Sequence, residues 1–246
     1  IVTNNEPLLD FVRHAGISTR VEIIPNGVDP QRFYPADDQQ QRQTIRDTLG
    51  IAASDIMITT VGGIMPRKGS HLLLEAWAQL AVEFPHVHLV LVGPRKDLEQ
   101  PGLKNFRNQL RKSVSTSGAP ERVHFTGLCK NVEEYQRASD IFVLPSEREG
   151  MPNSVLEAMA SRVAVIVTPF KGLSHDLGTP GTHFLLCDRN VTDLASALRL
   201  LLKNPAQRSK FAAQGYQWIR ENMNIERSLD RYAALYHELA AAHKTE

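Results

Sequence analysis

The chain has 246 residues, and its 28 lysines and arginines nearly balance 27 aspartates and glutamates, for a formal net charge of +1. Ordinary usage of glycine and proline excludes collagen-like and disordered classes, and the near-neutral charge argues against a nucleic-acid partner. Two cysteines are too few for a disulfide framework, and no apolar run reaches the roughly 20 residues of a membrane span, so we expect a cytoplasmic protein. Because the chain begins at Ile1 in what reads as mid-protein sequence, we expect it to be a piece of a longer protein.

Short apolar runs alternate with segments of helical periodicity along most of the chain. A helix is predicted from about residue 153 to residue 161, and two amphipathic helices are predicted at about 205–222 and 226–243. The strand runs are apolar throughout rather than alternately polar, so both faces of the sheet are expected to be covered, as in a doubly wound, Rossmann-like parallel α/β sheet. The predicted buried strands are residues 56–61, 87–92, 123–125, 141–144 and 163–167.

The chain divides into three predicted parts. Residues 1–20 fit the alternation poorly and are interpreted as a helix and connector left from a preceding domain, residues 21–225 form the Rossmann-like domain, and residues 226–246 form a closing helix. In sheets of this class ligands bind at the carboxyl ends of the strands, where the strand order reverses. Functional residues are therefore expected in the loops after Val61, Val92, Phe125, Leu144 and Val167.

The loop after Leu144 is suited to binding an anion. It contains a glycine that permits a tight turn and a proline that suits a first helical turn, and amides at a helix start have no acceptor within the helix. Phosphate is the anion that such a helix start favours. The predicted site consists of Gly150, Met151, Pro152, Asn153 and Ser154, with free amides assigned to Met151, Asn153 and Ser154.

Two carboxylates, Glu149 and Glu157, flank this predicted anion site. Each carboxylate can accept hydrogen bonds from two neighbouring hydroxyl groups, so the pair suits a ligand with paired hydroxyls. A second interpretation fits the spacing equally well: Glu157 balances the helix dipole, and Glu149 lies in solvent.

The loop after Val61 places two cations, Arg67 and Lys68, beside glycines at the start of a helix. Such cations can neutralise a diphosphate through charge-assisted hydrogen bonds, although a plain basic loop is the alternative. The loop contains neither a P-loop nor a Gly-x-Gly-x-x-Gly motif. Because the chain has no Asp-x-Asp pair, we expect neither a metal ion nor another cofactor, and cations with helix amides suffice for a diphosphate.

Several runs together resemble one family. Glu149 and Glu157 match a Glu-x7-Glu signature, and residues 24–29, 123–127 and 138–146 match further runs of the same family. Over about residues 21–236 the chain resembles the C-terminal, donor-binding domain of the family 4 glycosyltransferases, which are retaining enzymes with the two-domain GT-B fold.

This resemblance implies a role for each matched residue. Glu149 would contact hydroxyls of the donor sugar, Glu157 the ribose diol of the nucleotide, and Lys68 the diphosphate, helped by the amides of residues 151–154. The catalytic set is Glu149, Lys68 and Arg67, and the donor-binding set comprises Gly62, Gly63, Lys68, Gly127, Leu128, Glu149, Gly150, Met151, Pro152, Asn153, Ser154 and Glu157, with Gly127 and Leu128 lining the base.

The chain departs from the family pattern at three places. The diphosphate arginine of the family follows the glycine matched by Gly62, and this chain has Gly63 there; our hypothesis is that Arg67 takes its place from the next turn. The family's Gly-x-Pro after the signature helix is also absent, since residues 162–164 read Arg-Val-Ala. This change affects a helix-to-strand turn, and therefore packing more than catalysis. The family's Gly-x-Pro-Glu loop is not matched at residues 172–176, so no donor-sugar contact is assigned there.

The resemblance implies retaining transfer of a sugar from a UDP-, GDP- or ADP-sugar to a glycan or a lipid-linked acceptor. Acceptor contacts would lie on an N-terminal domain that this piece lacks and toward which the closing helix would pack, so the piece alone is expected to be inactive in transfer. Peripheral contact with a membrane is a further expectation, because many enzymes of the family act on lipid-linked acceptors. The alternatives are a non-catalytic nucleotide-sugar binding module and a sugar-nucleotide epimerase.

Overall fold

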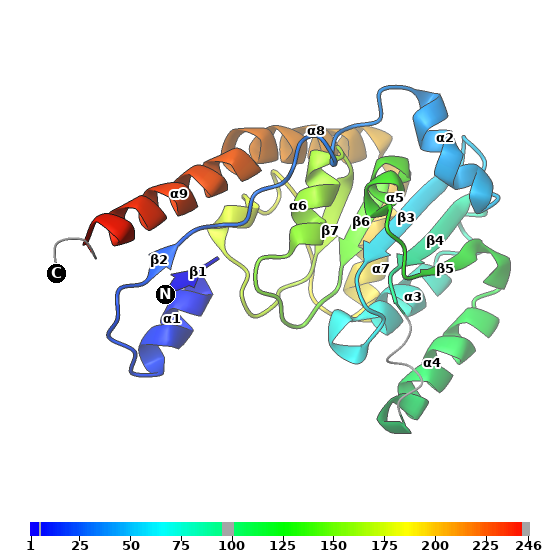
Figure 1. The fold of residues 1–246 in the computed structure, drawn as a ribbon. Coiled ribbons are helices and arrows are strands. Elements are labelled where there is room, and N and C mark those ends of the chain that lie inside the picture. The colour runs from blue at the N-terminus through cyan, green and yellow to red at the C-terminus, as the bar shows by residue number, and fades with distance from the viewer. Residues whose placement is uncertain (5, 95–100, 243–246) are drawn as a thin grey trace.

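The computed structural model describes residues 1–4, 6–94 and 101–242, and a six-stranded parallel sheet forms its centre (Figure 1). The strand order is β5-β4-β3-β6-β7-β8, and every neighbouring pair runs parallel. The strands are β3 (Ile56–Val61), β4 (Val87–Val92), β5 (Val123–Gly127), β6 (Ile141–Leu144), β7 (Ala164–Val167) and β8 (Leu185–Leu186).

Helices cover both faces of this sheet, which confirms the predicted doubly wound class (Figure 1). Along β6, Ile141 and Val143 pack into one apolar cluster, whereas Phe142 and Leu144 pack into another on the opposite face. All four are at most 1% exposed, as expected when successive side chains point to opposite, equally covered faces. One face carries α3 (Ser70–Ala78), α4 (Lys104–Ser115) and α7 (Val191–Lys203), and the other carries α2 (Gln39–Thr48), α5 (Val132–Ala138) and α6 (Asn153–Ala160). Helix α8 (Pro205–Asn222) contributes Phe211 to the cluster of the first face and Ile219 to that of the second.

The two ends of the chain lie together beside the sheet layers (Figure 1). Strands β1 (Val2–Thr3) and β2 (Glu22–Ile23) pair as a separate parallel ribbon, with α1 (Glu6–His14) between them in sequence. The closing helix α9 (Ile225–Ala242) runs along this ribbon, and an ion pair joins Arg20 to Glu238. The predicted domain boundaries at residues 20 and 226 stay a prediction.

The strand order fixes where a ligand site can form. From β3 the chain adds β4 and β5 on one side and then returns to add β6, β7 and β8 on the other. The order therefore reverses between β3 and β6, and in sheets of this class ligands bind in the crevice outside the carboxyl ends of the strands at this point.

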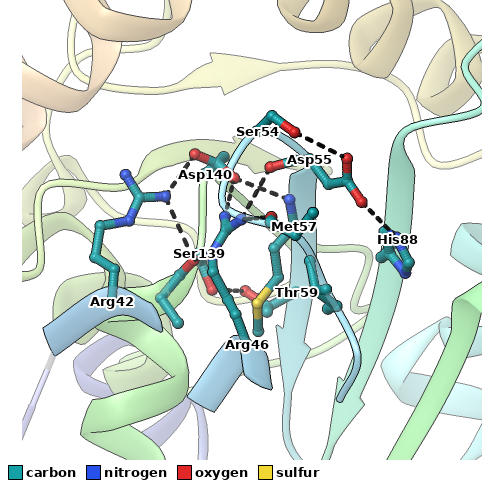
Figure 2. Close-up of polar contacts among 12 residues, drawn as sticks. Arg42, Arg46, Ser54, Asp55, Met57, Thr59, His88, Ser139 and Asp140 are labelled. Atoms are coloured by element: carbon teal, nitrogen blue, oxygen red, sulfur yellow. Dashed lines mark hydrogen bonds and ion pairs between the residues drawn. The ribbon is translucent and has the colours of Figure 1, made fainter. Parts of the chain in front are cut away.

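The opposite, amino-terminal end of the sheet holds a network of paired polar side chains (Figure 2). Arg46 is 2% exposed; it contacts Asp140 at 2.5 Å and donates to the Ala138 carbonyl at 3.0 Å. Asp140 also accepts from the Met57 amide at 2.9 Å and from Arg42 at 2.7 Å. Burial lowers the pKa of Arg46, and the charge of Asp140 acts in the opposite direction.

The same end continues toward the edge strand β5 through two histidines. His88 Nε2 lies 3.2 Å from Asp55 Oδ2, and His88 Nδ1 lies 3.1 Å from His124 Nε2. We call Arg42, Arg46, Asp55, His88, His124 and Asp140 the amino-end network.

Candidate functional site

The loops after β3 and β6 meet in direct backbone contact. Gly69 has a φ of +71°, and a Cβ there would lie 2.1 Å from the Pro145 carbonyl oxygen, so only glycine fits. The amide of Glu147 donates to the carbonyl of Arg67 at 2.8 Å. This contact brings together the predicted anion-binding loop after Leu144 and the predicted basic loop after Val61.

Lys68 and Glu149 form an ion pair across this contact. Lys68 Nζ lies 2.6 Å from Glu149 Oε1, and the two side chains keep 20% and 11% of their exposure. The interpretation that Glu149 lies free in solvent is therefore wrong, because the carboxylate is largely covered and paired. An ammonium has three donors and a carboxylate has two oxygens, so the pair retains capacity for a phosphate and for hydroxyl groups.

The start of α6 lies beside this pair and offers backbone donors. Pro152 occupies the N-cap position without a side-chain cap. The N–H groups of Met151 and Ser154 have no hydrogen-bond acceptor among the described residues, as predicted. The prediction was wrong for Asn153, whose N–H donates to the Met151 carbonyl at 3.0 Å in a turn that precedes the helix. Two amides rather than three are thus available to an anion.

Glu157 lies one turn further along α6 and is mostly buried. Burial raises its pKa to about 6, Arg32 acts to lower it, and the nearby Glu133 acts to raise it. Arg32 is itself paired with Glu133 at 3.0 Å. The charge of Glu157 therefore changes within the range of pH in which proteins are ordinarily studied.

Arg67 precedes Lys68 in the same turn, and Gly62 at the end of β3 lies beside the lysine side chain. Arg67 lies in a short 3-10 turn, is exposed, and directs Nη1 to within 3.4 Å of the Arg148 carbonyl. A Cβ on Gly62 would lie 3.7 Å from Lys68 Cε, so the lysine stem passes over this glycine. Arg67 is thus placed at the rim of the crevice, and its role as a substitute for the family arginine at Gly63 stays a hypothesis.

Gly127 and Leu128 lie at the adjoining end of β5. Gly127 forms an isolated bridge with Gly93, and a Cβ on Gly93 would lie 2.0 Å from the Gly62 carbonyl oxygen. The ends of β3, β4 and β5 are therefore in close contact. Leu128 is 73% exposed, which leaves its apolar side chain available to a planar ligand group.

Three further residues support the site and were missed in the sequence. Asn26 Nδ2 donates to Asn153 Oδ1 at 2.7 Å, Gln136 Nε2 donates to the Ser154 carbonyl at 3.1 Å, and Arg189 Nε donates to the Pro145 carbonyl at 2.9 Å. Only Asn26 lies in a run that the sequence singled out, residues 24–29. Gln136 and Arg189 reach the site from elements distant in sequence, and no local pattern marks them.

Across residues 1–4, 6–94 and 101–242, no group of three or more His, Cys, Asp or Glu side chains could hold a metal ion. No helix in the same ranges is long and apolar enough to cross a membrane.

Comparison with known proteins places this chain in a family. The family model described as "Glycosyl transferases group 1" matches residues 41–218, which is more than half of the chain. The chain therefore belongs to the group 1 glycosyl transferases. A D-inositol 3-phosphate glycosyltransferase of Geodermatophilus obscurus is 30% identical over 94% of this chain and 51% of its own length.

Solved structures of glycosyltransferases share the fold. The C-terminal domain of the group 1 protein LpcC from Francisella tularensis is 30% identical, with a TM-score of 0.71 over 81% of this chain and all of that domain. HepE from Anabaena, solved with UDP and glucose, gives a TM-score of 0.82 over 96% of this chain and 62% of its own, at 19% identity. The match to GT-B glycosyltransferase structures confirms the predicted fold class. The chain spans about half the length of the curated relatives that it matches.

Proposed function

We propose that this chain is the donor-binding part of a retaining glycosyltransferase and that it binds a nucleotide diphosphate sugar in the crevice between β3 and β6. The observation that carries the proposal is the Lys68–Glu149 ion pair beside the start of α6, in a chain of the group 1 family. The donor class is a UDP-, GDP- or ADP-sugar, and the acceptor is a glycan or a lipid-linked sugar. The UDP and glucose held by the Anabaena protein support a donor of this class.

The cations and amides of the site bind the diphosphate. Lys68 uses one of its three N–H donors on Glu149 and offers the others to phosphate oxygens, together with the N–H groups of Met151 and Ser154. Arg67 adds positive charge at the rim. As the bond between the anomeric carbon and the diphosphate oxygen breaks, negative charge grows on the leaving group, and donors already in place stabilise it.

The carboxylates and the end of β5 bind the rest of the donor. Glu149 accepts hydrogen bonds from sugar hydroxyls through its second oxygen, Glu157 accepts from the ribose diol, and Leu128 beside Gly127 contacts the base. The acceptor oxygen bonds to the anomeric carbon on the face that the diphosphate leaves, and the acceptor proton passes to the diphosphate. Binding of the acceptor requires residues outside this chain, so the chain alone binds donor without transferring sugar.

Calorimetric titration with UDP, GDP and ADP, each with and without its attached sugar, tests donor binding. The proposal predicts that one of the three nucleotides binds. Lys68→Ala is expected to weaken that binding by about 1.5–3 kcal/mol, the range for a hydrogen bond to a charged group. Arg67→Ala weakens it less, since Arg67 is exposed, and Lys210→Ala, at an exposed position in α8, is the matched control. Absence of binding at millimolar nucleotide would contradict the proposal.

A non-catalytic nucleotide-sugar binding module is the second candidate. It is favoured by Gly63, which leaves the family's arginine position without a cation. A transfer assay on the complete protein separates the two functions, because a binding module releases the donor unchanged whereas a transferase consumes it.

A further inference from the structure

The segment Pro25–Val28, which we call the crossing segment, passes between the α8–α9 junction and the start of α6. On the side of the junction, the Val28 amide donates to the Met223 carbonyl at 2.8 Å, and the Ile225 amide donates to the Val28 carbonyl at 3.2 Å. Ser228 Oγ donates to the Pro25 carbonyl at 2.7 Å. The crossing segment is therefore held by hydrogen bonds to Met223, which follows α8, and to Ile225 and Ser228 of α9.

Gly27 brings the two backbones into contact within this segment. A Cβ at this position would lie 2.2 Å from Ile225 Cα and 2.4 Å from the Ile225 nitrogen, so any side chain would displace the start of α9. The crossing segment thus has little freedom to move relative to the junction, and a side chain that it projects is held in a defined place.

Asn26 is the side chain that the crossing segment directs at α6. Its Nδ2 donates to Asn153 Oδ1 at 2.7 Å, and Asn153 is the first residue of α6. Because this hydrogen bond uses the side-chain oxygen of Asn153, both N–H donors of the Asn153 side-chain amide remain for another acceptor. Because the N-cap position holds Pro152, no side-chain cap competes for this end of the helix.

We propose that Asn26 is a positioning residue for the donor diphosphate. It orients the Asn153 side chain so that the side-chain amide group of Asn153 binds phosphate oxygens together with the backbone N–H groups of Met151 and Ser154. This inference rests on the proposed function. The third donor to the phosphate is then the Asn153 side chain rather than the Asn153 backbone N–H, because the backbone N–H is used in a turn. It also links the α8–α9 junction to the donor site through one hydrogen bond.

The test measures the affinity of the chain for UDP, GDP and ADP and for the matching nucleosides, in the variants Asn26→Ala, Asn153→Ala and the double variant. Each single variant is expected to weaken binding of the diphosphate about tenfold, as for a hydrogen bond to a charged group, with little change for the nucleoside. The double variant is expected to be no weaker than either single variant, because both remove the same donor.

Ser228→Ala is the matched control, since it removes another hydrogen bond of the crossing segment without touching α6. Its affinity for the diphosphate is expected to stay within about twofold of the unaltered chain. Thermal unfolding of every variant separates loss of folding from loss of binding, and Asn153→Ala is at an exposed position that tolerates truncation.

Two results would overturn the inference while leaving the proposed function in place: an Asn26→Ala variant that binds the diphosphate as tightly as the unaltered chain, or a Ser228→Ala variant that is weakened as much as Asn26→Ala. If the unaltered chain binds none of the three diphosphates, the proposed function fails and the inference fails with it.

Discussion

The two ends of the central sheet use polar residues in different ways. At the amino end, Arg46, Asp140 and Asp55 are paired with one another, with backbone groups or with His88, and Arg46 is almost completely buried. At the carboxyl end, Lys68 and Glu149 are paired but partly exposed, and the N–H groups of Met151 and Ser154 have no acceptor in the described part of the chain.

This difference separates stability from binding. A buried, fully paired network is costly to break, because removing one partner leaves an uncompensated charge. Donors that are held in place but have remaining capacity cost little to the fold and are available to a ligand. The amino end is therefore expected to determine stability, and the carboxyl end to determine affinity for the donor.

Asp140→Ala should have the largest effect, and it acts on stability. The substitution leaves Arg46 buried without its carboxylate and the Met57 amide without its acceptor, so the free energy of unfolding should fall by about 3–5 kcal/mol. Denaturant unfolding measures this change. Glu83→Ala, which removes exposed ion pairs to Arg199 and Lys203, is the control and should barely change stability. Equal losses in the two variants would contradict the comparison.

The charge of Glu157 should give donor binding a pH dependence of intermediate size. Burial raises its pKa to about 6, so the group is mostly protonated at pH 5 and mostly ionised at pH 7. If the ionised form accepts the ribose hydroxyls, nucleotide affinity rises by up to about tenfold between pH 5 and pH 7, following the ionised fraction. Titrations at several pH values should show this rise, and Glu157→Gln should remove it. A rise that persists in Glu157→Gln would assign the titration to another group.

The histidines of the amino-end network should give the smallest effect, a loss of stability in acid. Burial lowers the pKa of both His88 and His124. Below about pH 6.5 these two histidines bind protons in the unfolded chain but not yet in the folded chain. Their contribution to the free energy of unfolding is therefore complete above that pH and is lost as the pH falls from 7 toward 5.

His124→Gln tests this dependence, with unfolding measured at pH 7.5 and pH 5.5. It should cost roughly 0.5–1.5 kcal/mol at the higher pH through the lost contact with His88 and should reduce the difference between the two pH values. His14→Gln, at an exposed histidine in α1, should leave that difference unchanged. A pH dependence that is the same in both variants would exclude the buried histidines as its source.

The sequence predicted the central sheet because its strands are continuous apolar runs. Residues 56–61, 87–92 and 141–144 were predicted with the bounds that β3, β4 and β6 have in the structure. The two-residue strands β1, β2 and β8 were missed, since two residues are too short for any period to appear. Their pairing is decided by the packing of the rest of the chain.

The site could be predicted only where strand topology brings residues together. Lys68 and Glu149 are 81 residues apart, yet both follow strands whose carboxyl ends meet at the crevice, and this placed them near each other. Asn26 and Asn153 are 127 residues apart and meet because α9 and the crossing segment pack together, for which the sequence has no periodic signal. The start of the helix at Asn153 was predicted correctly, and the Asn153 N–H was misassigned because it donates to the Met151 carbonyl in a local turn that no helical pattern signals.

Amide hydrogen exchange with and without the nucleotide that binds would test the separation of the two ends most directly. The account predicts slower exchange on binding for amides of residues 62–69 and 150–156 around the crevice. It predicts no change at residues 55–57 and 139–141 in the amino-end network. Protection confined to the amino end, or absent from both crevice loops while nucleotide is bound, would contradict the account.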